Sequence, residues 1–310
     1  MPELGILSVH IRNLGRVSPY VVAQHGTWSE PARTRAARRY AEHVSPTALP
    51  PIAHSPAART RLRWEIGIVL ALSFGASAVY AVVSLIDSLT RDSALAEQTA
   101  TINRVLSERP AFDLVYQLLG FAFALAPVAL VAYLVWQPRR PHFAALGVGG
   151  QARWGRELLG GLGLAALIGI PGIAFYVVSK LIGINVTVIP TALDTYWWTV
   201  PVLVLHAFRA AVTEEIIVVA YLFDRLRRLG VGTVGVIVSS ALLRGSYHLY
   251  QGFGGFIGNV VMGLVFGWAY HRYGRSVPLV VAHWILDIVS FAGYPLALAL
   301  WPAWFGAPGS

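Results

Sequence analysis

The stretch from Arg209 to Arg228, RAAVTEEIIVVAYLFDRLRR, most constrains what this chain can fold into. It places two adjacent glutamates, Glu214 and Glu215, inside an apolar run that begins near Trp197 and ends at Phe223. A charge at the centre of a membrane helix costs about 2.5–3.5 kcal/mol even on lenient insertion scales. A structural ion pair between helices would explain one buried glutamate, but two in succession favour a functional site.

The composition is typical of a membrane protein. Of the 310 residues, 56% are hydrophobic and only 13% are charged, which predicts an all-α polytopic membrane protein. The chain has no cysteine, so disulfides and thiolate metal sites are excluded. The arginines behind the formal charge of +9 lie mostly before the first apolar run and in loops between the runs, so this charge indicates a membrane surface as the partner and no nucleic acid.

Seven apolar runs follow residue 64, each about as long as a bilayer requires. They are expected at 65–88, 112–136, 157–182, 196–226, 231–250, 255–271 and 277–300. We therefore predict about seven transmembrane helices, or eight, around a polar cavity within the membrane.

The arginines outside these runs predict the orientation. Eighteen lie before the first run or in alternate loops, 137–156, 224–230 and 272–276, whereas the other loops carry only Arg91, Arg104 and Arg109. Positive charge marks the cytoplasmic side. We expect a multi-pass protein of the plasma membrane, with its N-terminus in the cytoplasm and its C-terminus outside.

Ionisable residues inside the runs gather toward the C-terminal half. The six that we take as the candidate site are Glu214, Glu215, Arg244, His248, His283 and Asp287. Arg244 and His248 are four residues apart, as are His283 and Asp287, so each pair shares one helix face. Two further groups on the fourth run, His206 and Arg209, are interpreted as hydrogen-bonded core and left outside the site.

In their order and spacing, three motifs resemble the CPBP intramembrane proteases, also called the Abi family, which are bacterial relatives of the type II CAAX prenyl endopeptidase. The family patterns are Glu-Glu-x-x-x-Arg, Phe-x-x-x-His and His-x-x-x-Asn. Here TEEIIVVAYLFDRL supplies Glu214 and Glu215, RGSYH supplies His248, and HWILD supplies His283 and Asp287. The resemblance covers roughly residues 196–295.

The chain is expected to have four parts. Residues 1–63 are expected to be a disordered basic cytoplasmic arm, and 64–195 a set of N-terminal transmembrane helices. Residues 196–300 would form a catalytic CPBP-like helical core, and 301–310 a short C-terminal tail.

Two positions depart from the family pattern. Val219 stands where the first motif has arginine, and Arg244 where the second has phenylalanine. We predict that the cation has moved from the fourth helix to the fifth and pairs with Glu215. Asp287 replaces asparagine, so it is either protonated, or orients His283, or ligates a metal.

The resemblance implies hydrolysis of a peptide bond in a membrane-anchored or membrane-associated substrate. Glu214 would be the base that activates water, His248 would hold that water, and His283 would stabilise the oxyanion. Glu215 and Arg244 would support these groups. Along straight helices the three catalytic residues would lie about 15, 25 and 9 Å deep, so tilted or broken helices are required.

Alternatives remain open from the sequence. Glu214, His248, His283 and Asp287 include a plausible zinc set, although we favour a metal-free site. Intramembrane acids and histidines also occur in proton-coupled transporters, and the same fold could serve a non-catalytic immunity or scaffold protein.

Overall fold

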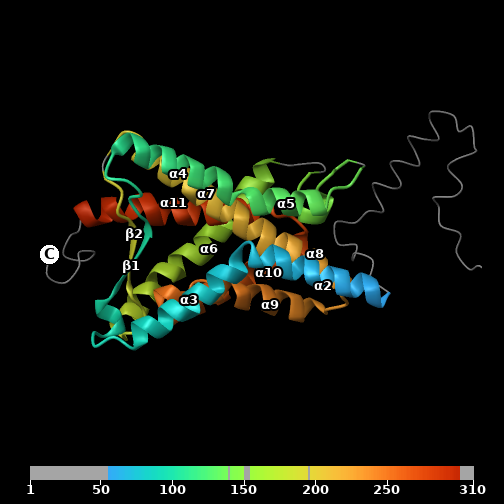
Figure 1. Ribbon diagram of the computed structural model, residues 1–310, viewed down its shortest axis with the longest axis horizontal. Coiled ribbons are helices and arrows are strands. Elements are labelled where there is room, and N and C mark those ends of the chain that lie inside the picture. The colour runs from blue at the N-terminus through green and yellow to red at the C-terminus, as the bar shows by residue number, and fades with distance from the viewer. Residues whose placement is uncertain (1–54, 139, 150–153, 195, 301–310) are drawn as a thin grey trace, which may run out of the picture. The chain divides into compact units, whose positions relative to one another are not determined.

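Helices make up most of the computed structural model, which describes residues 55–138, 140–149, 154–194 and 196–300, with side chains to residue 293 (Figure 1). The α-helices are α2 (Pro56–Ala71), α3 (Phe74–Leu89), α4 (Pro110–Ala124), α5 (Ala126–Leu134), α6 (Trp154–Leu181), α7 (Thr199–Glu214), α8 (Leu222–Arg228), α9 (Thr233–Ser246), α10 (Phe253–Tyr273) and α11 (Val277–Leu300). A π-helix, η4 (Glu215–Tyr221), joins α7 to α8, and 3₁₀ turns lie at η2 (Leu95–Glu97), η3 (Ala144–Leu146) and η5 (Leu249–Gln251).

The first helix starts earlier than the sequence analysis placed it. Ser55 caps α2 by accepting a hydrogen bond from the Ala58 N–H, and Pro56 occupies the first helical turn, both of which favour helix initiation. The predicted boundary at residue 64 is therefore wrong. The remainder of the predicted arm, through residue 54, and the C-terminal tail lie outside the described residues.

Fewer helices have the length and hydropathy of a membrane span than the seven or eight predicted. Among the described residues, three helical stretches are long and apolar enough to cross a membrane, namely Pro110–Leu134, Trp154–Leu181 and Phe253–Tyr273, and α2 with α3 make a fourth if a pair bent by 55° counts as one span. A count of seven or eight is not confirmed, because the inner helices are interrupted: α7 has 16 residues and α9 has 14, and a span needs about 20.

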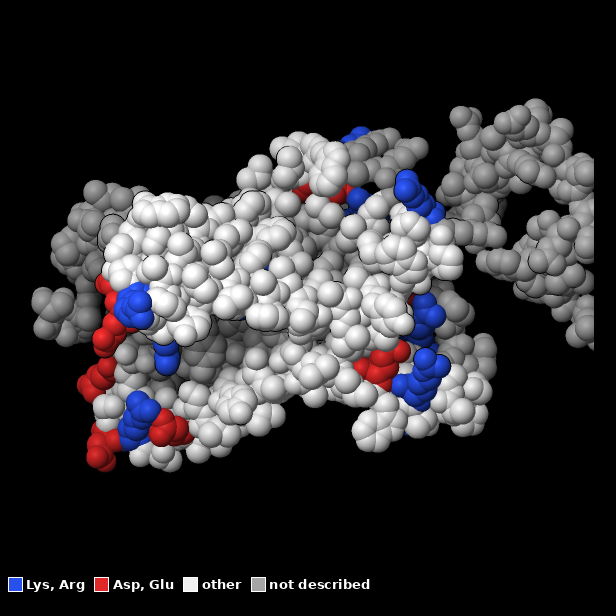
Figure 2. All heavy atoms as spheres, turned by 45° about the horizontal axis from the view of Figure 1, so that its top comes forward, with Lys and Arg blue, Asp and Glu red and all other residues white. Residues whose placement is uncertain are grey.

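The outer helices present apolar side chains outward, as expected of a membrane-embedded protein. The most apolar stretches of Pro110–Leu134 and of α6 are each only 11% buried. Figure 2 shows charged side chains gathered toward the two ends of the helical part, with an almost uncharged band between them. A band of this kind matches the hydrocarbon layer of a bilayer, which charged groups avoid.

The core is centred on η4, between α7 and α8. The side chains from Ile217 to Tyr221 are fully buried, and they pack with residues of α5, α10 and α11 such as Val131, Phe266 and Leu279. The glutamate stretch thus runs through the interior of the helical bundle, where protein surrounds it on several sides.

The all-α class is confirmed, and one small sheet of two strands accompanies the helices. Strands β1 (Thr99–Asn103) and β2 (Thr187–Thr191) pair in parallel, with Thr99 opposite Thr187. Beyond them, Asn185 bridges to Gly252, which has φ +98 and leaves no room for a Cβ, since one would lie 2.6 Å from the Ile184 carbonyl oxygen. This glycine ties the sheet end to η5, next to His248.

Candidate active site

Glu214 is the last residue of α7 and the residue after it opens the π-helix. The Leu222 N–H donates to the Ile217 carbonyl, the i to i+5 pattern of a π-helix. Four consecutive β-branched residues, 216–219, lower the preference for a regular α-helix here. Such π segments are often found at functional sites, and this one changes the helical register directly after the first glutamate.

Arg244 lies between the two glutamates and is completely buried. Its Nη2 is 2.5 Å from Glu215 Oε1, and its Nη1 is 3.4 Å from Glu214 Oε2. The expected pair between Arg244 and Glu215 is therefore present. Val219, at the position of the motif arginine, is fully buried in the apolar core, and the arginine that contacts both glutamates comes from α9.

His283 lies between two carboxylates. Its Nδ1 is 2.7 Å from Glu215 Oε1, and its Nε2 is 3.5 Å from Asp287 Oδ2. The first distance is that of a hydrogen bond, whereas the second is longer than an ordinary one. Glu215 thus fixes the imidazole ring on one side, and the other ring nitrogen stays available.

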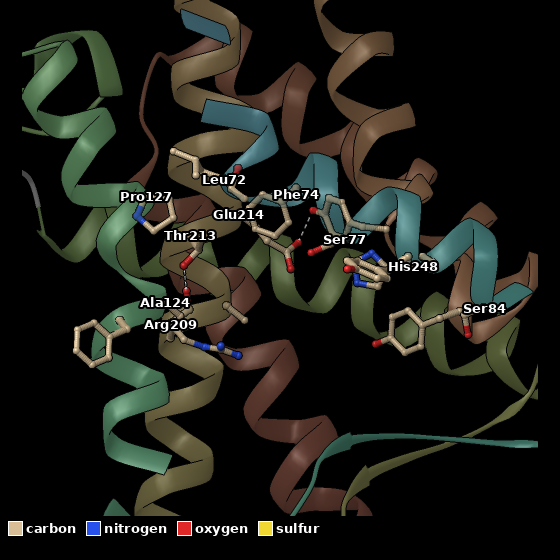
Figure 3. A pocket seen from close by; sticks show the side chains of 17 residues that line it. Leu72, Phe74, Ser77, Ser84, Ala124, Pro127, Arg209, Thr213, Glu214 and His248 are labelled. Carbon is tan, nitrogen blue, oxygen red and sulfur yellow. Dashed lines mark hydrogen bonds between the residues drawn. The ribbon is translucent and has the colours of Figure 1, made fainter. Parts of the chain in front are cut away.

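Glu214 faces an open cavity of about 670 Å³ that is lined by α3, α4, α7 and the turn at η5 (Figure 3). The Tyr247 hydroxyl donates to Glu214 Oε2 across 2.8 Å. Arg244 approaches the same oxygen. Within the described part of the chain, Glu214 Oε1 has no such partner, so it is the oxygen that a water in the cavity can reach.

His248 reaches the same cavity from beyond the end of a helix. α9 ends at Ser246, so Arg244 and His248 do not continue along one helix face as predicted. The turn instead brings His248 Nδ1 to 2.9 Å from the Arg244 carbonyl oxygen. A ring nitrogen that faces a carbonyl must donate, which leaves Nε2 as the acceptor. Figure 3 shows His248 across the cavity from Arg209.

The structure divides the predicted site residues into two groups. Glu214 and His248 line the cavity, whereas His283 and Asp287 are not among its lining residues, and His283 instead contacts Glu215, as Arg244 also does. His206 is hydrogen-bonded to Gln117 at 3.0 Å, as expected for a core histidine.

Sequence reasoning missed two cavity residues, Tyr247 and Arg209. Arg209 lies inside an apolar run, five residues before Glu214, and this position favoured its inclusion among the candidate site residues. No sequence pattern distinguishes Tyr247 from the other tyrosines near helix ends.

The residues in place do not fit the zinc set that the sequence suggested. Over the part of the chain with described side chains, no three His, Asp or Glu groups are arranged to hold a metal ion. Glu215 Oε1 is occupied by Arg244 and His283, and Glu214 Oε2 by Tyr247. The mechanism proposed for this chain therefore uses no metal ion.

The fold and the site together define a membrane-embedded helical protein with a carboxylate centre inside its bundle. Residues 196–289, from the start of α7 into α11, match the family model described as "Type II CAAX prenyl endopeptidase Rce1-like". The match contains all three motifs and is consistent with a member of the CPBP family, so the resemblance inferred from the motifs is confirmed. Comparison with curated proteins gave no match, and neither did comparison with solved structures.

Proposed function

We propose that this chain is an intramembrane endopeptidase that hydrolyses a peptide bond with a water activated by Glu214. The observation that carries the proposal is the state of this carboxylate. One oxygen is held by Tyr247 and Arg244, while the other is without a partner among the described residues beside a cavity that His248 also lines. A positioned base next to space for water and a peptide is what hydrolysis requires.

In the proposed reaction, water lies between Glu214 Oε1 and His248 Nε2. Glu214 takes a proton as the water oxygen attacks the peptide carbonyl carbon, which gives a tetrahedral oxyanion. When the carbon–nitrogen bond breaks, Glu214 returns that proton to the leaving amine. Proton transfer by a positioned side chain contributes about 10²–10⁴-fold to a rate.

His283 is the proposed donor to the oxyanion. Its Nδ1–H donates to Glu215, so its Nε2 can donate to the oxyanion only when the ring is a protonated imidazolium, a form that the neighbouring carboxylates of Glu215 and Asp287 stabilise. We assign Asp287 to orienting this nitrogen and Arg244 to balancing the charge of the two glutamates. A donor of this kind is typically responsible for about 10²–10³-fold in rate.

The substrate would be a peptide or protein anchored in, or associated with, the lipid bilayer. Charge in the loops favours the plasma membrane, with the N-terminus in the cytoplasm and the C-terminus outside. An inactive relative that serves as an immunity or scaffold protein, or a proton-coupled transporter, would share these features but would release no peptide.

The decisive experiment measures cleavage of a membrane-anchored peptide by purified protein in lipid nanodiscs, with the products identified by mass spectrometry. Glu214→Gln keeps the shape and the bond from Tyr247 but removes the base, so we expect the rate to fall at least about 100-fold. Glu108→Gln, at an exposed position, is the matched control and should retain the parental rate.

Two results would contradict the proposal. Near-parental cleavage by Glu214→Gln would remove Glu214 from the mechanism. A parent protein that is folded but cleaves no membrane-anchored peptide would favour the non-catalytic or transport alternatives.

A further inference from the structure

Arg209 brings a positive charge into the cavity of the candidate active site. It lies on α7, five residues before Glu214, and its side chain lines the same cavity as Glu214, Tyr247 and His248 (Figure 3). No other arginine or lysine among the described residues lines this cavity. The catalytic roles assigned above make no use of it.

The Arg209 guanidinium has no hydrogen-bond or ion-pair partner in the part of the chain that is described, and its Nε is buried without an acceptor. Glu214 and Asp287 are close enough to act on its charge through space, but neither forms an ion pair with it. Other arginines of the bundle differ, since Arg225 and Arg244 each contact carboxylates directly.

An arginine in an apolar region is costly unless an anion or other acceptors satisfy it. The five N–H groups of a guanidinium form a planar fork that matches both oxygens of a carboxylate. Nε is buried, but the two Nη groups are not, and neither has a partner among the described residues, so the edge that Arg209 can offer the cavity is the two-pronged one formed by its Nη groups.

The surrounding charges make such a donor necessary for an acidic ligand. Glu214, Glu215 and Asp287 are three carboxylates near the cavity, and Arg244 is already engaged by the glutamates. A fourth carboxylate would be repelled unless a free cation met it. A neutral apolar peptide, in contrast, would gain nothing from Arg209.

We propose that Arg209 is a carboxylate-binding subsite of the cavity, and that the preferred substrate carries a carboxylate close to the cleaved bond. The carboxylate is either the C-terminus of the peptide or the side chain of an aspartate or glutamate. Along α7, Arg209 is about 7.5 Å from Glu214, which corresponds to about two residues of extended peptide. That the bound peptide is a substrate rests on the proposed function, but binding of a carboxylate at Arg209 can be tested without cleavage.

The test measures peptide binding by fluorescence anisotropy in nanodiscs of neutral lipid, with Glu214→Gln protein so that no peptide is consumed. The first pair of labelled peptides differs only in ending with a free carboxylate or a carboxamide. The second pair is amide-capped and differs in one internal glutamate or glutamine. We expect the acidic member of one pair to bind at least about tenfold more tightly, because a hydrogen bond to a charged group typically increases affinity by this factor or more. The pair that responds identifies the source of the carboxylate.

Arg209→Gln in the same background should abolish this preference, whereas the matched variant Arg156→Gln, which removes a charge from an exposed position on α6, should preserve it. Should Arg209→Gln fail to fold, Arg209→Lys is used. An ammonium cannot form the planar fork, so the preference should shrink severalfold.

Equal binding within both pairs of peptides would overturn the proposal. So would a preference for the acidic peptide that persists in Arg209→Gln or is unchanged in Arg209→Lys. The proposal also fails if anionic lipid displaces the peptides only when Arg209 is present. The last result would assign Arg209 to a lipid phosphate. An acid preference without any cleavage by the parent would refute the proposed endopeptidase and leave the subsite intact.

Discussion

At the scale of single residues, the site depends on one arginine that serves two glutamates. Arg244 contacts Glu215 directly and Glu214 more weakly, and all three groups are buried. The family motif has an arginine at the position of Val219, and we infer that the charge of Arg244 compensates for its absence. Removal of one partner of a buried pair leaves an uncompensated charge, which is far costlier than the loss of an exposed pair.

Arg244→Ala should therefore lower the free energy of unfolding by about 3–5 kcal/mol and abolish cleavage, because both glutamates lose their counter-charge. Thermal unfolding in detergent and the cleavage assay measure the two effects. Arg272→Ala, at an exposed position on α10, is the control and should change neither. A variant at Arg244 that is as stable and active as the parent would disprove the relocated cation.

Asp287 is the second residue that departs from the family pattern, and its contact with His283 Nε2 is 3.5 Å long. Asparagine at this position keeps an acceptor and gains a donor, so Asp287→Asn should retain activity within about tenfold of the parent, and chelators should not inhibit the parent. If Asp287 instead supported a metal ligand, its loss would cost about 10–100-fold. Inactivity of Asp287→Asn, together with stoichiometric zinc in the purified protein, would reverse the assignment.

At the scale of elements, glycines on α10 set the position of Arg244. A Cβ on Gly263 would lie 2.7 Å from the Ala241 Cα and 3.4 Å from the Arg244 Cδ, and Gly267 meets Phe223 and α9 in the same way. These small residues therefore allow close packing of α9 against α10. Close approach of α9 and α10 leaves Arg244 enclosed between α10 and the glutamates.

Gly263→Ala should push α9 away from α10, so that stability falls by about 1–3 kcal/mol as in other overpacked cores and the cleavage rate falls with it. Gly163→Ala is the matched control, because a Cβ there meets nothing within 4 Å and alanine favours a helix. Thermal unfolding of both variants checks the prediction. Equal stability of the two would show that the α9–α10 contact does not position the site.

At the scale of the whole described unit, the basic segments that the sequence assigned to one side of the membrane lie at one end of the bundle. Side-chain contacts join the start of α2, the ends of α5, α8 and α10, and the start of α6. These contacts are Arg59 with the Leu229 carbonyl, Arg225 with the Leu134 carbonyl, Arg227 with His271, and Arg275 with Glu157. Strands β1 and β2 lie at the opposite end, toward the C-terminal end of α11 (Figure 1).

We therefore expect the end with these arginines to face the cytoplasm. In a bacterial host, a reporter that is active only in the cytoplasm should be silent when fused to the C-terminus and active when fused after Leu229. A cysteine introduced at the exposed Asp92, between α3 and η2, should react with an impermeant thiol reagent from outside. The opposite labelling pattern would show that the protein is inverted.

Much of the site chemistry and the class of fold could be read from the sequence, because hydropathy and residue spacing are local properties. The apolar runs predicted most helices to within a few residues, and three motifs identified the family. Glu214, Glu215 and Arg244 were also grouped correctly, since two charges in an apolar run need a cation and few were present.

What the tertiary structure alone decided is which of these groups meet. On straight helices, Glu214, His248 and His283 would lie at different depths. Three interruptions bring them to their places: the π-helix after Glu214, the end of α9 at Ser246 and the bend between α2 and α3. Packing elsewhere in the bundle offsets the energetic cost of these interruptions. Because these breaks depend on long-range contacts, the sequence could not show that His248 turns into the cavity with Glu214, Tyr247 and Arg209, while His283 and Asp287 do not line it.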